Sequence, residues 1–189
     1  MATPKYIIVH HAGGTDSAPL ADSSNYTLAQ CNADHKARFN MLSSLGYYVG
    51  YTYFIDKLGH VTQTRKDGEV GAHTIGRNQD SIGICLAGNF DAFQPTAAQI
   101  QSLKTLMAAK VAAFSIPLEN IYPHRHFATK SCYGKLLADD WARKLLAPVP
   151  VPPTPTPTPT PAPTPQAAVI AEIEALLTQL SALLKKLVV

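Results

Sequence analysis

The sequence predicts an α/β fold in which a mixed β-sheet is flanked by helices, followed by a single C-terminal helix. Apolar, β-branched runs alternate along the chain with segments of helical pattern. A glycine-containing turn joins two of these runs as a hairpin, so at least one pair of strands is antiparallel. A proline- and threonine-rich stretch over 148–165 then separates the body of the protein from its tail.

The first two elements follow from local patterns. Residues 5–9 form an apolar run that is typical of a buried strand. Thr27 and Gln30 have the spacing of a capping box, which predicts the start of a helix. We expect that helix to run toward Leu45 and to stop at Gly46.

A hairpin and a buried strand are expected next. Residues 51–56 and 60–64 are strand-like and flank the turn Lys57-Leu-Gly59. Residues 81–86 form another apolar, β-branched run, which predicts a second buried strand.

Two more helices complete the predicted body. Thr96 and Gln99 repeat the capping-box spacing, and the helix that they begin should reach about Phe114. A last helix should run from near Gly134 to Leu146.

The proline-rich stretch divides the chain into three parts. Proline fixes φ and lacks an amide donor, so neither a helix nor a sheet is expected over 148–165. Residues 1–147 are therefore expected to form one folded domain, 148–165 a semi-rigid linker, and 166–189 an amphipathic helix.

The tail has the pattern of a coiled coil. Apolar residues recur at alternating spacings of three and four, at Ile170, Ile173, Leu177, Leu180, Leu184 and Leu187. Val169, Leu176 and Leu183 widen this stripe. Self-association into a homo-oligomer is the preferred interpretation, and contact with a membrane surface is the second choice. Polar residues interrupt the stripe too often for a membrane span.

The composition suits one domain with appendages. The chain has 189 residues, 46% of them hydrophobic, and a formal net charge of +3. Its Lys and Arg residues are scattered, so we expect no nucleic-acid partner, whereas an acidic polymer such as a cell wall is compatible. The three cysteines are widely spaced, which argues against a disulfide framework. Cys31 and Cys85 are expected to be buried thiols.

Several residues have the chemistry of a metal site. His124 and Cys132 offer an imidazole and a thiolate, which are preferred zinc donors, and His10 at the end of the first strand is the best candidate for a third. The competing interpretation is that these are ordinary packed or solvated side chains, because the spacing of seven residues between His124 and Cys132 is a weak motif. His11, His35, His60 and His126 are expected to be surface or structural histidines.

Five ordered motifs give a more specific indication. The motifs are YIIVHH (6–11), VGYTYF (49–54), VGAHTIGRN (70–78), SIGICLAGNF (81–90) and the stretch 124–132. Together they resemble the zinc-dependent N-acetylmuramoyl-L-alanine amidases, the family of phage amidase lysozymes and peptidoglycan recognition proteins. The resemblance spans most of residues 5–147. It implies a mixed sheet with packed helices and a groove with zinc at its floor.

The resemblance also assigns roles to single residues. It implies that one zinc ion is held by His10, His124 and Cys132, with Tyr51 and Lys130 beside it as catalytic residues. A lysine ammonium suits the stabilisation of an oxyanion, and a tyrosine hydroxyl can hold water or substrate.

Two further positions match the family near its groove. His73 is assigned to substrate binding, and support of a metal ligand is the alternative. Asn78 is assigned to substrate binding at the groove rim, although the shaping of a turn is the stronger interpretation.

The implied activity is hydrolysis of the bond between N-acetylmuramic acid and L-alanine in bacterial peptidoglycan, as in a phage endolysin. The N-terminal segment lacks a signal-peptide core, so we expect synthesis in the host cytoplasm and action on the cell wall after release. Two alternatives are a non-catalytic peptidoglycan-binding module, which would be expected to lack the cysteine ligand, and a cytoplasmic amidase that recycles wall fragments.

Overall fold

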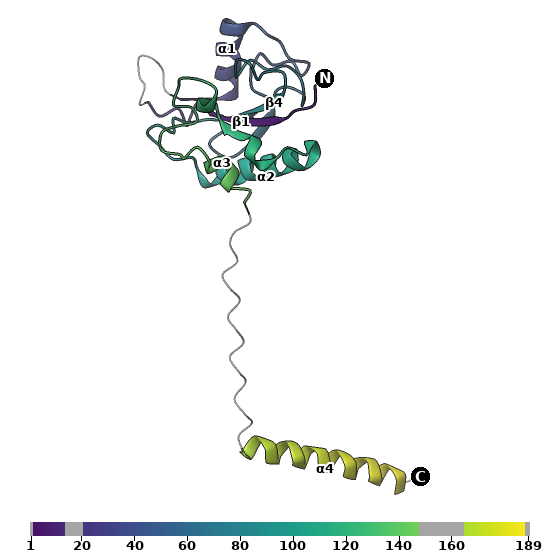
Figure 1. Ribbon diagram of the computed structural model, residues 1–189. Coiled ribbons are helices and arrows are strands. Elements are labelled where there is room, and N and C mark those ends of the chain that lie inside the picture. Colours follow the sequence, from purple (N-terminus) through teal and green to yellow (C-terminus); the bar gives the residue numbers. More distant parts are fainter. Residues whose placement is uncertain (1, 14–20, 148–164, 188–189) are drawn as a thin grey trace. The chain divides into compact units, whose positions relative to one another are not determined.

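A computed structural model describes residues 2–13, 21–147 and 165–187 (Figure 1). The chain divides into two compact units, Met1–Pro148 and Val149–Val189. The linker predicted over 148–165 lies almost wholly outside the described residues. The first unit contains the sheet and its helices, and the second contains one helix.

A five-stranded sheet forms the centre of the first unit. Its strands are β1 (Tyr6–His11), β2 (Tyr53–Ile55), β3 (Val61–Gln63), β4 (Ser81–Leu86) and β5 (Ile121–Pro123), in the spatial order β3-β2-β4-β1-β5. The β2–β3 pair is antiparallel and every other pair is parallel, so the predicted mixed sheet and its hairpin are confirmed. The strand β5 was not predicted. It ends in a proline, which an edge strand tolerates because its outer side needs no amide donor.

Helices cover both faces of the sheet, with α1 (Leu28–Phe39) on one side and α2 (Ala97–Phe114) and α3 (Trp141–Lys144) on the other (Figure 1). Successive side chains of a strand point to opposite faces. In β4, Ile82 and Ile84 accordingly join the core that contains Leu103 of α2, whereas Cys85 packs with Cys31 of α1. Both of these cysteines are buried free thiols, as expected.

The helix α1 (Leu28–Phe39) begins at the predicted capping box. The Thr27 hydroxyl accepts a hydrogen bond from the Gln30 amide, and the Gln30 side chain accepts one from the amide of Thr27. The predicted end near Leu45 is wrong. Asn40 adopts a left-handed conformation with φ 47°, which asparagine tolerates, and its amide bonds to carbonyls of the last turn, so the helix ends there.

The helix α2 (Ala97–Phe114) confirms the second capping box, and Ser115 in a left-handed conformation ends it. Two short 3-10 turns follow, Leu118–Asn120 and His124–His126. The predicted helix from Gly134 to Leu146 is mostly wrong, because only α3 (Trp141–Lys144) is helical. Gly134 has φ +117°, and the backbone of Phe90 lies so close that no side chain would fit there, so this segment is a turn.

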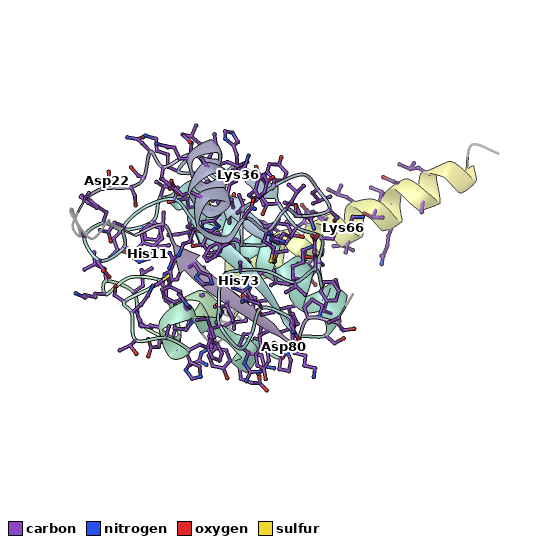
Figure 2. The ribbon with its side chains drawn as sticks, turned by 90° about the horizontal axis from the view of Figure 1, so that it is seen from above. His11, Asp22, Lys36, Lys66, His73 and Asp80 are labelled. Atoms are coloured by element: carbon purple, nitrogen blue, oxygen red, sulfur yellow. The ribbon has the colours of Figure 1, made fainter. Side chains whose placement is uncertain are left out.

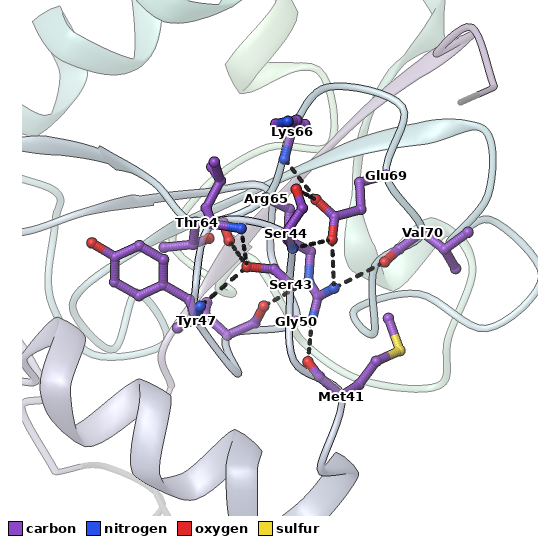
Figure 3. A network of polar contacts seen from close by, with 12 residues as sticks. Met41, Ser43, Ser44, Tyr47, Gly50, Thr64, Arg65, Lys66, Glu69 and Val70 are labelled. Carbon is purple, nitrogen blue, oxygen red and sulfur yellow. Dashed lines mark hydrogen bonds and ion pairs between the residues drawn. The ribbon is translucent and has the colours of Figure 1, made fainter.

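A buried arginine holds together the loops on the α1 side of the sheet by hydrogen bonds (Figure 3). Arg65 is 1% exposed. Its Nε donates to the Val49 carbonyl at 2.7 Å, Nη1 to Val70 at 3.1 Å and Nη2 to Met41 at 2.6 Å. The Glu69 carboxylate lies 3.8 Å from Nη1 and balances the charge. One side chain therefore satisfies three carbonyls of loops that have little regular structure.

In the second unit, the described residues form α4 (Pro165–Leu187). The described apolar side chains of its predicted stripe are each at least 51% exposed, at Val169, Ile170, Ile173, Leu176, Leu177, Leu180 and Leu184. The side chains of Leu183 and Leu187 are outside the described set. Among the described residues, no helix is long and apolar enough to cross a membrane.

The Arg65 network predicts a large loss of stability on substitution. Arg65→Met keeps the apolar stem but leaves three buried carbonyls without donors, so the free energy of unfolding should fall by about 3 kcal/mol. Urea unfolding of the full chain measures this. Lys104→Met on α2, an exposed position, is the control and should change stability by less than about 0.5 kcal/mol. A loss below about 1 kcal/mol for Arg65→Met would contradict the proposed role.

Candidate metal centre and active-site cavity

One cavity of about 1150 Å³ brings together all the residues to which the sequence assigned a site role. Its lining includes His10, Tyr51, His73, Asn78, His124, Lys130 and Cys132. These residues come from four of the five motifs, which lie far apart in the sequence. The cavity lies at the carboxyl end of the parallel strands, where sheets of this kind usually present functional groups.

The position of His10 follows from the register of β1. Val9 pairs with Pro123 of β5, so His10 and His124 are the next residues on adjacent parallel strands. Their rings lie 4.4 Å apart between centroids. His10 is 1% exposed and faces the α1 side of the sheet, because Ile7 and Val9 occupy the opposite face.

Three potential metal ligands converge at this point. One donor atom from each of His10, His124 and Cys132 lies within 4.8 Å of the others. The Sγ atom of Cys132 is 3.8 Å from Nδ1 of His10. Two such donors on a tetrahedral zinc ion would be about 3.6 Å apart, as calculated from the usual bond lengths. The arrangement could hold a metal ion with little adjustment.

Burial keeps the imidazoles of this cluster neutral. Desolvation lowers the pKa of His10 well below its usual value. Desolvation, aided by the nearby Lys130, lowers the pKa of His124 to about 4. Burial also raises the pKa of the Cys132 thiol to about 12. Neutral imidazoles have free lone pairs for a cation, and a bound cation would favour the thiolate form of Cys132.

Polar contacts fix the loop that carries Cys132. The backbone amide of Arg125 donates to the Cys132 carbonyl at 2.6 Å, and the Arg125 guanidinium donates to the carbonyl of Gly134 at 2.6 Å. The Asp91 carboxylate accepts from the Ser131 hydroxyl at 2.6 Å. The Sγ atom itself accepts from the amide of His11 at 3.3 Å. The thiol is therefore held against the end of β1 from two sides.

Tyr51 forms one wall of the cavity beside His10. The two rings lie 5.0 Å apart between centroids. Burial raises the pKa of Tyr51 well above its usual value, so the hydroxyl keeps its proton and can donate a hydrogen bond. The ring of Tyr51 also lies 5.2 Å from the ring of His35, measured between centroids. The His35 ring is held in place because its Nδ1 accepts a hydrogen bond from the amide of Gly50 at 2.7 Å.

His73 lies behind His10 and is buried. Figure 2 shows it over the sheet, between His11 at the carboxyl end of β1 and Asp80 toward the other end. Its Nδ1 is 3.2 Å from Nε2 of His10. Of the two roles expected for His73, this contact favours support of a ligand.

Asn78 shapes the turn that precedes β4. Its side-chain oxygen accepts hydrogen bonds from the amides of His73 and Thr74, both at 2.8 Å. Asn78 also lines the cavity, so both of the roles considered for it are compatible with its position. Lys130 is exposed and lines the same cavity.

Four titratable residues of the cavity lining were not predicted as site residues: His11, His35, Arg38 and Asp91. His11 and His35 were expected to be surface or structural histidines, and each does accept a hydrogen bond from a backbone amide, but both also line the cavity. His35 and Arg38 are three residues apart on α1, a spacing that places them on one helix face, and this was the signal in the sequence. His11 has no comparable signal, because a strand normally turns adjacent residues to opposite faces.

Comparisons with known proteins agree with this geometry. The family model described as N-acetylmuramoyl-L-alanine amidase matches residues 1–135. A human N-acetylmuramoyl-L-alanine amidase is 27% identical over 136 residues, covering 71% of this chain and 23% of the human protein. The endolysin of Escherichia phage T7 is 37% identical over 91 residues, covering 44% of this chain and 58% of the endolysin. The chain thus spans about a quarter of the first relative and just over half of the second.

The fold also has solved counterparts. The endolysin N-acetylmuramoyl-L-alanine amidase LysCS from Clostridium intestinale superimposes with a TM-score of 0.58 at 25% identity. The match covers 70% of this chain and 76% of that protein. The amidase-like fold predicted from the sequence is confirmed.

The environment of His35 predicts a pH dependence of stability. Burial lowers the pKa of His35 to about 4, below its ordinary value of 6.5. Between these values the unfolded chain binds the proton and the folded chain does not, so stability should fall as the pH drops from about 6.5 to about 4. Urea unfolding of the metal-free full chain across this range measures the slope.

His35→Asn is the informative variant, because Asn can still accept from the Gly50 amide but does not titrate. Its slope should be shallower than that of the parent. The control is His126→Asn, at an exposed position, which should keep the parental slope. Equal slopes for the parent and His35→Asn would contradict the prediction.

Proposed function

This chain belongs to the N-acetylmuramoyl-L-alanine amidase family, and we propose that it hydrolyses the amide bond between N-acetylmuramic acid and L-alanine in bacterial peptidoglycan. The observation that carries this proposal is the convergence of His10, His124 and Cys132 at the cavity. Two imidazoles and a thiolate with one position left open are the donor set of a catalytic zinc site. A binding module without catalysis would not need these three donors.

We propose that one zinc ion is the cofactor and that His10, His124 and Cys132 are its ligands. When bound, zinc supplies Lewis-acid polarisation of a carbonyl and activation of water for hydrolysis. Two neutral imidazoles and one thiolate would leave the centre with one net positive charge. The described donors therefore fit the metal in type, number and separation.

Lys130 and Tyr51 are the proposed catalytic residues. As water adds to the carbonyl carbon of the scissile amide, negative charge develops on the carbonyl oxygen. The Lys130 ammonium can stabilise that charge, because it lies on the cavity wall and in the electrostatic range of His124. The protonated hydroxyl of Tyr51 can orient water or the substrate carbonyl.

The cavity suits a peptide that carries carboxylates. Arg38 and Lys130 both line it, and its volume of about 1150 Å³ is large enough for several residues of a stem peptide. We assign Asn78 to the rim of the substrate site, where it holds the turn of His73 and Thr74 in place.

The similarity to the phage T7 endolysin supports a lytic role. In this role the protein is made in the host cytoplasm and acts on the cell wall after release. An amidase that recycles wall fragments in the cytoplasm would have no use for α4, whose described apolar side chains are exposed.

We further propose that α4 makes the protein a homo-oligomer. Its exposed apolar side chains lie at heptad spacing and would be buried by association with other copies of the helix. Joined amidase domains would bind a repetitive polymer with increased avidity. Insertion of the same face into a lipid surface is the second choice.

The amidase proposal is tested by Cys132→Ser. A hydroxyl is a far poorer zinc ligand than a thiolate, so this variant should lose both bound zinc and activity. Zinc content is measured by elemental analysis, and activity by mass spectrometry of digested peptidoglycan, in which new free L-alanine amino termini mark cleavage. A chelator should abolish the same products from the parent. Near-normal activity with full metal content would overturn the assignment.

Lys130→Ala is the matched variant, because its proposed role is confined to the transition state. It should keep its zinc and its binding to cell walls while turnover falls by about 10²-fold. Loss of zinc from this variant would show that Lys130 supports the metal site rather than the reaction.

The oligomer is tested by truncation after Ala147. Every residue that lines the cavity is retained, so activity on small soluble substrates should be unchanged. Light scattering should show a monomer for the truncated protein and an assembly of more than two copies for the full chain, because the apolar face is wider than a two-stranded seam. Activity on intact cell walls should fall with truncation. A full chain that is monomeric at micromolar concentration and binds lipid vesicles through residues 166–189 would favour the membrane alternative.

A further inference from the structure

A chain of buried hydrogen-bonding groups runs from His10 away from the cavity. Nε2 of His10 lies 3.2 Å from Nδ1 of His73, and Nε2 of His73 lies 3.4 Å from the hydroxyl of Ser81. The Ser81 hydroxyl lies 2.5 Å from the carbonyl of Arg77. His10, His73 and Ser81 are all buried. None of the roles proposed above depends on Ser81.

The carbonyl of Arg77, the last group in this series, sets the donor and acceptor of every hydrogen bond before it. A backbone carbonyl can only accept, so the Ser81 hydroxyl donates to Arg77. The Ser81 oxygen is then free to accept from Nε2–H of His73, which leaves Nδ1 of His73 as an acceptor. Nε2 of His10 must therefore carry a proton and donate it to this hydrogen bond. Only Nδ1 of His10, the atom that faces Cys132, keeps a free lone pair.

We propose that Ser81, acting through His73, is a positioning residue that fixes the proton of His10 on Nε2 and presents Nδ1 to the metal. A histidine that binds a metal usually donates its other N–H to a partner that fixes its tautomer and orientation. Here that partner is a second imidazole, whose own tautomer is fixed by a serine. The inference rests on the metal site proposed above.

Packing holds the His73 ring in the position that this arrangement needs. Ser81 and Gly83 lie on the same face of β4, because they are two residues apart on a strand. A Cβ atom on Gly83 would come within 2.6 Å of the His73 ring, and one on Gly71 would come equally close. The two glycines therefore leave a slot for the imidazole between Ser81 and His10.

Thr74 contributes to the same group of contacts. Its hydroxyl oxygen lies 3.0 Å from Nδ1 of His73 and 3.4 Å from Nε2 of His10. It can donate to the acceptor nitrogen of His73 or accept from the donor nitrogen of His10. Both options agree with the proposed direction of the hydrogen bonds from His10 to Arg77.

The first experiment reads the tautomers directly. In the zinc-free full chain, ¹⁵N NMR of the histidine rings should show His10 and His73 protonated on Nε2. A proton on Nδ1 of His10 in the parent would overturn the inference. If the parent shows the expected tautomers but binds no zinc, the proposed zinc site fails while the hydrogen-bond chain stands, so the two failures are distinguishable.

The second experiment measures zinc affinity by competition with a chromogenic chelator. Ser81→Ala should bind zinc about 10-fold more weakly than the parent, because His73, the direct partner of His10, loses the acceptor that fixes its tautomer. Ser102→Ala is the matched control, because the Ser102 hydroxyl also donates to a backbone carbonyl, that of Gly59, at 2.6 Å. It should bind zinc as the parent does. Parental affinity in Ser81→Ala would overturn the inference.

A pair of variants at His73 separates positioning from simple loss of packing. His73→Asn places a side-chain oxygen close to the site of Nδ1 and can accept from His10, whereas His73→Leu cannot. Both variants remove the ring. His73→Asn should therefore bind zinc about 10-fold more tightly than His73→Leu. Equal affinities for the two variants would count against the proposed role of the hydrogen bond.

Discussion

In the register between β1 and β5, Val9 lies opposite Pro123, and the next residues, His10 and His124, therefore emerge side by side at the carboxyl edge of the sheet. The rest of the site depends on this alignment. Ile7 and Val9 fix it, because both are fully buried on the α2 side. A slip of one residue would turn them toward α1 and point His10 into the hydrophobic core.

The third donor is placed by different forces. Cys132 lies in a loop that is held against the end of β1 by hydrogen bonds. The amides of Arg125 and His11 donate to Cys132, and the neighbouring Ser131 donates to the Asp91 carboxylate. Hydrophobic packing thus positions two donors, and polar contacts position the third. The buried Arg65 has a comparable role in the loop that leads into Tyr51, where it donates to the carbonyl of Val49. Loops built in this way need few apolar residues to keep a defined geometry.

Local signals in the sequence predicted the elements that depend on local contacts. The capping boxes at Thr27 and Thr96 begin helices where expected, because each box is complete within four residues. Helix ends were less predictable. Asn40 ends α1 by adopting a left-handed conformation, and the close approach of Phe90 to Gly134 excludes a helix that the pattern favoured. That approach is a tertiary contact, which no local pattern contains.

The same distinction applies to the site. Every site residue that the motifs assigned lines the cavity, but the hydrogen bonds behind His10 depend on the sheet order. His73, held by the nearby Ser81 at the start of β4, reaches His10 only because β4 lies beside β1.

The two units differ in how far they bury the apolar side chains of their helices. In the first unit, α2 buries Leu103 and Met107 against the sheet, and such packing supplies most of the stability of a helix in a protein. In the second unit, the described apolar side chains of α4 remain at least half exposed. Burial of this stripe by association would supply the same kind of free energy to α4 that the sheet supplies to α2. Catalysis and avidity would then reside in separate parts of one chain, and each could change in sequence without disturbing the other.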